Sequence, residues 1–171
     1  MKTTFFTLIC LLAFSLYSCT NAPKQENETE IVVEEDNADE IQILDPVKWD
    51  YSSEKLADNQ YKITFNANID EHWYVYSNNI EDDGPIPTTI NYDENEIIDQ
   101  VENVEESGVV EKDGYDELFD MDIKKFGTGA TFSQVFTTKG TGTVTGYLEY
   151  MTCDSIQCLF PDPIEFTIEV E

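Results

Sequence analysis

Two segments of the chain alternate apolar and polar residues with a period of two. Tyr61 to Ile69 has an apolar side chain at every odd position, and Ile164 to Val170 has one at every even position. Because successive side chains of a strand point to opposite faces, each segment predicts a β-strand with one buried face. In the second segment, the side chains expected to face the core are Ile164, Phe166, Ile168 and Val170.

Four further segments are rich in β-branched and aromatic residues, as strands are: Trp73 to Ser77, Thr88 to Tyr92, Phe132 to Thr137 and Thr143 to Met151. Turns are predicted between strands at Asp83-Gly84-Pro85, Lys112-Asp113-Gly114, Gly127-Thr128-Gly129 and Gly140-Thr141-Gly142. No segment shows a sustained helical period. This pattern predicts an all-β fold, an immunoglobulin-like antiparallel β-sandwich.

The N-terminal residues predict export and a lipid anchor. Lys2 is followed by an apolar stretch of 12 residues, Phe5 to Leu16, which is too short for a membrane span of about 20 residues. The run Leu16-Tyr17-Ser18-Cys19 resembles a bacterial lipobox, although Tyr17 stands where a small residue is usual. We therefore expect a lipoprotein signal peptide over residues 1–18 and lipidation of Cys19, so that the protein contacts the membrane through its lipid anchor only. The alternative is an ordinary signal peptide that is cleaved elsewhere.

The charge of the chain is strongly acidic. Residues 26–40 contain eight Asp or Glu and no Lys or Arg, which predicts an acidic disordered linker over residues 19–43. The whole chain has 9 Lys plus Arg against 36 Asp plus Glu, a formal charge of −27. Nucleic acids and anionic lipids need clustered cations, so neither is an expected partner. Residues 44–171 remain as one predicted domain.

A pair of cysteines is the main candidate for chemistry. Cys10 and Cys19 precede the predicted domain, which therefore carries only Cys153 and Cys158, with four residues between them. In an exported protein, two close thiols form either a redox couple or a structural disulfide. A disulfide across so short a loop stabilises a fold by only about 2–3 kcal/mol, which favours redox work without excluding the structural reading.

Other chemistry finds little support in the sequence. A zinc site normally needs four ligands, and the domain offers two thiols and one histidine, His72. The acidic residues between Asp113 and Asp122 do not have the spacing of a calcium loop, and they predict a solvated acidic loop. No catalytic triad can be assembled around His72. We expect no cofactor and no metal site.

Three motifs, in order, resemble the N-terminal periplasmic domain of the thiol:disulfide interchange protein DsbD. The first is Glu71-His-Trp-Tyr-Val-Tyr-Ser77, similar to an aromatic strand of that domain. The second, Tyr115 to Phe126, is similar to its cap loop, and the third, Gly146 to Pro161, is similar to its strand and active cysteine pair. The resemblance covers about residues 47–171. The family usually has five residues between the two cysteines, where this chain has four.

The resemblance implies a function and a set of site residues. Domains of this family take electrons from a membrane-embedded partner domain and pass them to periplasmic thioredoxin-like proteins, for disulfide isomerisation or cytochrome c maturation. By resemblance, Cys158 joins the partner and Cys153 resolves the mixed disulfide. Residues expected to cap or line the site are Phe119, Glu117, Tyr74 and Tyr76.

The resemblance also implies a location. The chain ends at Glu171 without the family's membrane and thioredoxin-like domains, so either these are separate proteins, a membrane electron donor among them, or the domain has been reused. The protein is expected to be anchored facing the periplasm of a diderm bacterium, with outer-membrane and surface placement left open. The competing interpretation is a non-catalytic β-sandwich lipoprotein that binds a protein or glycan and uses Cys153–Cys158 as a structural disulfide.

Overall fold

The computed structural model describes residues 44–81 and 83–171, which form β-strands joined by turns and loops. The strands are β1 (Val47–Ala57), β2 (Gln60–Ile69), β3 (Tyr74–Tyr76), β4 (Thr89–Tyr92), β5 (Ile98–Val101), β6 (Glu105–Asp116), β7 (Met121–Thr138), β8 (Gly142–Glu149), β9 (Thr152–Cys153), β10 (Cys158–Leu159) and β11 (Ile164–Val170). The predicted signal peptide, Cys19 and the linker lie outside the described residues. Within the described part of the chain, no helix has the length and apolar character of a membrane span.

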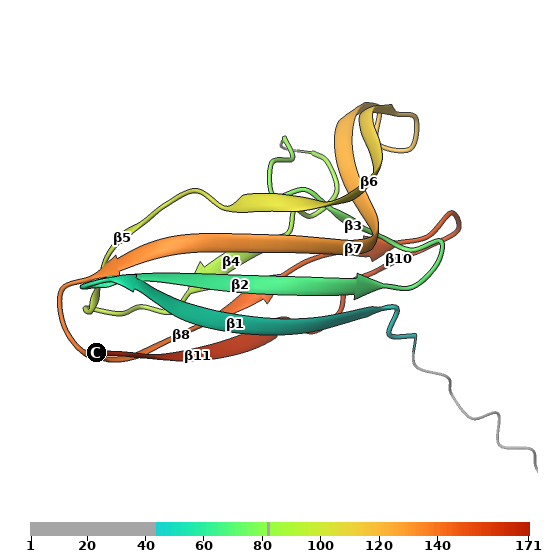
Figure 1. Ribbon diagram of the computed structural model, residues 1–171. Helices are drawn as coiled ribbons and strands as arrows, with labels where there is room; N and C mark the ends of the chain where they lie inside the picture. The colour runs from blue at the N-terminus through green and yellow to red at the C-terminus, as the bar shows by residue number, and fades with distance from the viewer. Residues whose placement is uncertain (1–43, 82) are drawn as a thin grey trace, which may run out of the picture. The chain divides into compact units, whose positions relative to one another are not determined.

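The strands form two antiparallel sheets, which lie on either side of the core (Figure 1). The small sheet has the order β11-β8-β4. The large sheet has the order β1-β2-β7-β3-β9-β10, and β5 and β6 also pair with β7. The 18-residue strand β7 is therefore the centre of the large sheet, with four different strands hydrogen-bonded along it. The predicted all-β, immunoglobulin-like antiparallel sandwich is confirmed.

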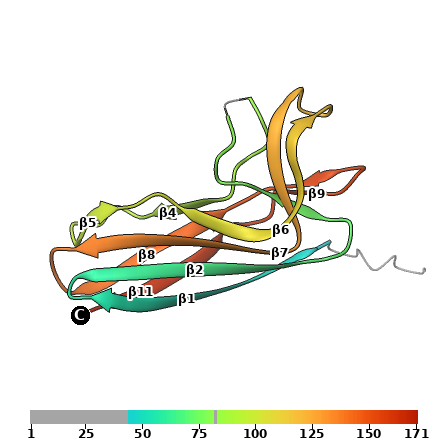
Figure 2. The same ribbon diagram turned by 45° about the horizontal axis from the view of Figure 1, so that its top comes forward.

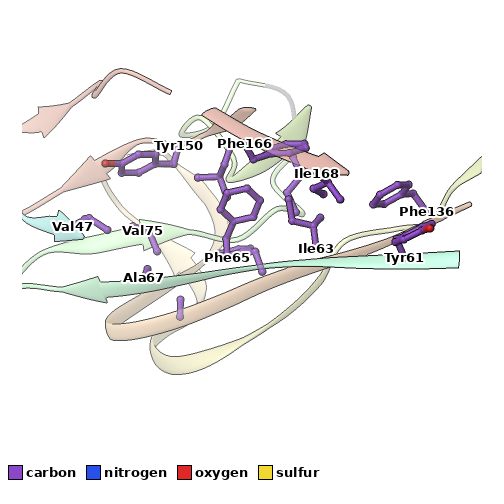
Figure 3. Packing of buried hydrophobic residues seen from close by; sticks show 14 of the residues in the cluster. Val47, Tyr61, Ile63, Phe65, Ala67, Val75, Phe136, Tyr150, Phe166 and Ile168 are labelled. Carbon is purple, nitrogen blue, oxygen red and sulfur yellow. The ribbon is translucent and has the colours of Figure 1, made fainter. Parts of the chain in front are cut away.

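The core follows the alternation in the sequence. Every odd position of β2 from Tyr61 to Ile69 is buried, and so are Phe166, Ile168 and Val170 of β11, while Ile164 is half-buried. Figure 3 shows side chains of both strands meeting between the sheets, with Phe65 and Phe166 next to each other. Their rings pack edge to face at a centroid distance of 5.8 Å, a favoured aromatic geometry. The predicted core face of the last strand is thus confirmed.

The predicted turn at Gly127-Thr128-Gly129 is wrong, because β7 continues through it as a bulge. Gly108 pairs with Ala130, but the next residue, Val109, pairs with Gly127, so β7 carries two extra residues here. The backbone can approach this closely only without a side chain, since a Cβ on Gly108 would lie 2.6 Å from the Gly129 carbonyl oxygen. On the C-terminal side of Gly127, β7 pairs with β2, and on its N-terminal side it pairs with β3. The bulge bends the strand, as bulges do.

The predicted turn at Lys112-Asp113-Gly114 is also wrong, since all three residues lie within β6. Most side chains of β6 are exposed, so the strand has no alternating pattern that the sequence could reveal. Its pairing with β7 continues to Asp116, opposite Met121, and the turn between them spans residues 117–120. The expected acidic loop is therefore the end of a long hairpin, which rises out of the plane of the sheet in Figure 2.

Candidate functional site

The cysteines lie where the chain crosses from one sheet to the other. The strand predicted over Thr143 to Met151 ends at Glu149 in the small sheet, and the next strand, β9, belongs to the large sheet. Tyr150 is buried in the main core at this crossing. Cys153 of β9 then pairs directly with Cys158 of β10, at the edge of the large sheet.

A tight turn between the cysteines is built by Asp154. The Asp154 backbone N–H donates to the carbonyl oxygen of Gln157 at 3.0 Å. The Asp154 carboxylate oxygen Oδ1 accepts hydrogen bonds from the backbone N–H groups of Ile156 and Gln157, both at 2.7 Å. Asp commonly stabilises turns in this way. The turn brings the Cα atoms of Cys153 and Cys158 to 4.1 Å, and the two sulfurs form a disulfide.

The disulfide lies on the outer face of the large sheet, away from the sandwich core. Val75 of β3 and Phe126 of β7 are register partners, and both belong to the main core. Because side chains alternate along a strand, Tyr74 and Tyr76 project from the opposite face. Cys153 is the register partner of Tyr74 on β3, so its side chain shares this outer face.

A second hydrophobic cluster surrounds the disulfide on this face. Its buried members are Tyr76, Ile123, Met151 and Cys153, and the partly buried side chains packed against them are Ile80, Phe119, Met121 and Cys158. These residues come from β3 and the loop after it, from the β6–β7 hairpin, and from the β9–β10 hairpin with the residue before it. The cluster shares no residue with the main core. It is a small apolar site built around two sulfurs.

The bend in β7 places the β6–β7 hairpin over the sheet. Met121 and Ile123 of β7 and Phe119 of the preceding turn contact the second cluster. The Phe119 ring stands edge-on to the Tyr76 ring, with a centroid distance of 5.8 Å and an interplanar angle of 83°. The hairpin that Figure 1 shows rising from the sheet therefore carries the apolar side chains that pack near the disulfide.

An ion-pair network holds the base of this hairpin. Asp116 is 7% exposed, and its Oδ2 lies 3.4 Å from Lys125 Nζ and 3.5 Å from Lys112 Nζ. Burial opposes ionisation of Asp116, but a hydrogen bond from the Leu118 N–H and the two ammonium groups outweigh it and lower the pKa of the carboxyl. The expectation of a fully solvated acidic loop is wrong for Asp116, because tertiary packing buries it beside two lysines.

The two tyrosines of β3 differ in their surroundings. Tyr76 is 1% exposed, and burial, with a smaller contribution from the Asp116 charge, raises the pKa of its hydroxyl to about 12. Tyr74 is half-buried, and Lys125 Nζ lies 4.7 Å from its ring centroid. The Tyr74 carbonyl oxygen accepts a hydrogen bond from Thr152 Oγ1 at 2.9 Å, which ties β3 to the cysteine hairpin. Both tyrosines therefore lie at the predicted site.

The two cysteines differ in exposure. Cys153 is 1% exposed, whereas Cys158 is half-buried. Apolar side chains next to them in the sequence reach into solvent: Ile156 is 89% exposed and Phe160 is 66% exposed. Cys158 is therefore the less buried residue of the pair.

The structure brings most of the predicted site residues together. Cys153, Cys158, Phe119 and Tyr76 share the second cluster, and Tyr74 is adjacent. Glu117 lies exposed in the hairpin turn and is not part of the cluster. The roles assigned to these residues stay predictions.

Residues with metal-binding side chains do not converge near the disulfide. His72 is exposed and its Nε2 lies 3.5 Å from a carboxylate oxygen of its neighbour Glu71. Among the residues that the structure describes, no three or more His, Cys, Asp or Glu form a group that could hold a metal ion.

Sequence reasoning missed several residues of the site. Met121, Ile123 and Met151 contact the disulfide cluster, and Lys125 borders it through Tyr74. Met121, Ile123 and Lys125 alternate along β7, which is a strand signal, but the surrounding acidic residues favoured a loop. Met151 could have been suspected, because it lies two residues before Cys153 and therefore on the same side of an extended chain.

Comparison with known proteins supports the fold. The sequence matches no protein-family model, and no curated protein matches it. The structure is similar to the N-terminal periplasmic domain of ScsB from Proteus mirabilis, with a TM-score of 0.50 and 13% identity, over 74% of this chain and 47% of that one. This chain thus spans about half the length of that relative. Similarity to the DsbD N-terminal domain of Neisseria meningitidis, in its reduced form, has a TM-score of 0.42 and 15% identity, over 70% and 82% of the two chains.

Proposed function

We propose that residues 44–171 form a periplasmic thiol–disulfide exchange module, which passes electron pairs through Cys153 and Cys158 to thioredoxin-like partners. The observation that carries this proposal is the position of the disulfide. It lies outside the main core, on the outer face at the edge of a sheet, within a separate apolar cluster. Paired strands hold both cysteines, and Cys158 is less buried than Cys153, which is the asymmetry that exchange with a second protein needs.

The same position argues against a mainly structural disulfide. Cys153 and Cys158 are already register partners in a two-residue ladder, joined by a turn with its own hydrogen bonds. Closing this loop, with a sequence separation of 5, removes little chain entropy. The chain-entropy relation gives about 2 kcal/mol. A staple between distant strands would stabilise the fold more.

The exchange follows from the different exposure of the two sulfurs. In the reduced module, the Cys158 thiolate attacks the disulfide of the partner, and a new bond joins Cys158 to one partner sulfur while the other leaves as a thiolate. The Cys153 thiolate then attacks Cys158 Sγ, which forms the Cys153–Cys158 disulfide and releases the second partner sulfur. Two electrons pass to the partner, whose thiolates take up two protons from solvent. These transfers would serve disulfide isomerisation or cytochrome c maturation.

A donor restores the reduced state by the reverse steps. Its thiolate attacks Cys158 Sγ, and the electron pair of the broken S–S bond remains on Cys153. We propose that this donor is a separate membrane protein and that the module is tethered near it by acyl chains on Cys19. The linker over residues 19–43 would give the tethered module its reach.

Trapping experiments test the exchange. A Cys153→Ser variant cannot resolve the mixed disulfide, so it should accumulate a covalent complex with a periplasmic thioredoxin-like protein through Cys158. The Cys158→Ser variant is the matched control and should trap little, because Cys153 is 1% exposed. Non-reducing gel electrophoresis followed by mass spectrometry identifies the linked cysteines. Equal trapping by both variants would contradict the assigned roles.

The alternative function is a binding lipoprotein with a structural disulfide. Exposed apolar side chains at Ile156 and Phe160 favour this reading only in part, since they could also contact an exchange partner. Reduction of the native protein separates the two functions. A disulfide that resists dithiothreitol until the domain unfolds, with no trapping by either variant, would support the binding lipoprotein.

A further inference from the structure

Lys125 lies on the outer face of the large sheet, which also holds the disulfide. It is the register partner of Tyr76 on β3, and its Nζ lies 4.7 Å from the ring centroid of Tyr74. Tyr74 is in turn the register partner of Cys153. Because β3 lies between β7 and β9 in the sheet, Tyr74 stands between Lys125 and Cys153.

We propose that Lys125 stabilises the thiolate of Cys153, as a positioning residue of the exchange site. The proposal rests on the proposed function, because Cys153 is the sulfur that leaves when a donor attacks Cys158. Cys153 is 1% exposed, and burial disfavours a charged thiolate. The S–S bond breaks faster when the leaving thiol has a lower pKa, so a nearby cation assists both reduction of the module and the later attack by Cys153.

Charged groups of both signs lie around Lys125. Lys125 and Lys112 share the single carboxylate of Asp116, and the Glu111 carboxylate lies beside Gly127, two residues along β7 from Lys125. The nearest acid on the cysteine hairpin is Asp154, whose carboxylate is bound to two backbone N–H groups in the turn. Tyr76, whose pKa is raised to about 12 by burial, is neutral at pH 7. Glu117 lies exposed at the hairpin turn.

Lys124 provides a matched control beside Lys125. Lys124 Nζ lies 3.1 Å from the Glu106 carboxylate and 5.0 Å from the ring centroid of Phe126. Lys124 therefore has an ion pair and an aromatic contact, as Lys125 has, and its side chain is 31% exposed against 20%. Phe126 belongs to the main core, so Lys124 is turned away from the face that carries the disulfide.

The test measures the pKa of Cys153 directly. In the full chain with Cys158→Ser and ¹³C-labelled cysteine, the ¹³Cβ shift of Cys153 is followed against pH. Replacing Lys125 by Met should raise the pKa of Cys153 by about one unit, a tenfold shift in its ionisation. Lys124→Met should leave this pKa unchanged, and Lys125→Arg should restore it. In the chain with both cysteines, Lys125→Met should slow reduction by dithiothreitol about threefold.

A second variant separates charge from structure. Asp116→Asn keeps an acceptor for the Leu118 N–H but removes the negative charge, so it should lower the pKa of Cys153. A merely structural role predicts that Lys125→Met and Asp116→Asn shift this pKa in the same direction, since both break the same ion pairs. Shifts of opposite sign support the proposal.

Two outcomes would overturn the proposal, and they have different meanings. A native disulfide that dithiothreitol reduces and a partner resolves, with no response of the Cys153 pKa to Lys125→Met, removes the role of Lys125 and leaves the exchange function intact. A disulfide that is reduced only when the domain unfolds removes both the exchange function and the role of Lys125.

Discussion

Replacing Phe119 by Ala tests whether the β6–β7 hairpin limits access to the disulfide. Phe119 is partly buried against the second cluster and packs edge-on to Tyr76. A fully buried Phe side chain contributes about 1.5–3 kcal/mol, and partial burial suggests the lower end. The aromatic pair adds about 0.5–1.5 kcal/mol. Together they predict that the variant weakens closure of the hairpin by about 2 kcal/mol.

This loss should appear as faster chemistry at the disulfide. Every 1.4 kcal/mol is a factor of ten in an equilibrium, so 2 kcal/mol raises the population of an opened hairpin about 30-fold. When opening precedes attack, the rate of reduction by dithiothreitol should rise by the same factor. The rate is measured under native conditions by quenching samples with an alkylating reagent and determining the masses of the products by mass spectrometry. Leu118→Ala is the control, since Leu118 is 74% exposed and should change the rate less than twofold.

If Phe119→Ala leaves the reduction rate unchanged but lowers the free energy of unfolding, Phe119 is only a packing residue of the second cluster. If Leu118→Ala accelerates reduction as much as Phe119→Ala, the effect comes from the hairpin turn in general and not from the aromatic ring.

Two further predictions concern the fold and its pH dependence. Phe166→Ala should lower the free energy of unfolding in urea by about 3–5 kcal/mol, because Phe166 is 2% exposed and packs on Phe65 and Tyr92. Its exposed neighbour gives the control Thr167→Ala, and equal losses for the two would contradict the assigned core face. The raised pKa of Tyr76, about 12, means that the folded state keeps its proton when the unfolded state loses it. Stability should therefore fall as pH rises from about 10 to 12, and Tyr76→Phe should flatten that decline.

Local alternation of apolar and polar residues was enough to predict β2 of the large sheet and β11 of the small sheet. β2 and β11 each have one face in the core. Their apolar and polar residues therefore alternate with the two-residue period of a strand. β6 is different, because its side chains are mostly exposed and it is held by backbone hydrogen bonds to β7. When both faces of a strand are exposed, its sequence has no alternation of apolar and polar residues. The charged sequence of β6 therefore predicts a turn and a loop instead of a strand.

The glycines of β7 show a second limit. Gly127 and Gly129 have the composition of a turn, and a turn between strands is what such a segment usually forms. Here β2 and β3 pair with different parts of the same edge of β7. The bulge lies between these two parts, so a single bent strand pairs with both. Only the packed sheet decides between a bulge and a turn, because both need residues that tolerate close backbone approach.

The sequence by itself determined the β-sandwich, the face that its regular strands bury, and the two cysteines as the centre of any chemistry. It did so because strand periodicity and cysteine spacing are local properties of the chain. Tertiary structure decided that the disulfide lies on the outer face, that a bent hairpin brings Met121 and Ile123 to it, and that Asp116 is buried between Lys112 and Lys125. The first two features join segments about thirty to eighty residues apart, and no local pattern encodes which distant strands will pair. The third lies within one hairpin, where it depends on how the hairpin packs on the sheet.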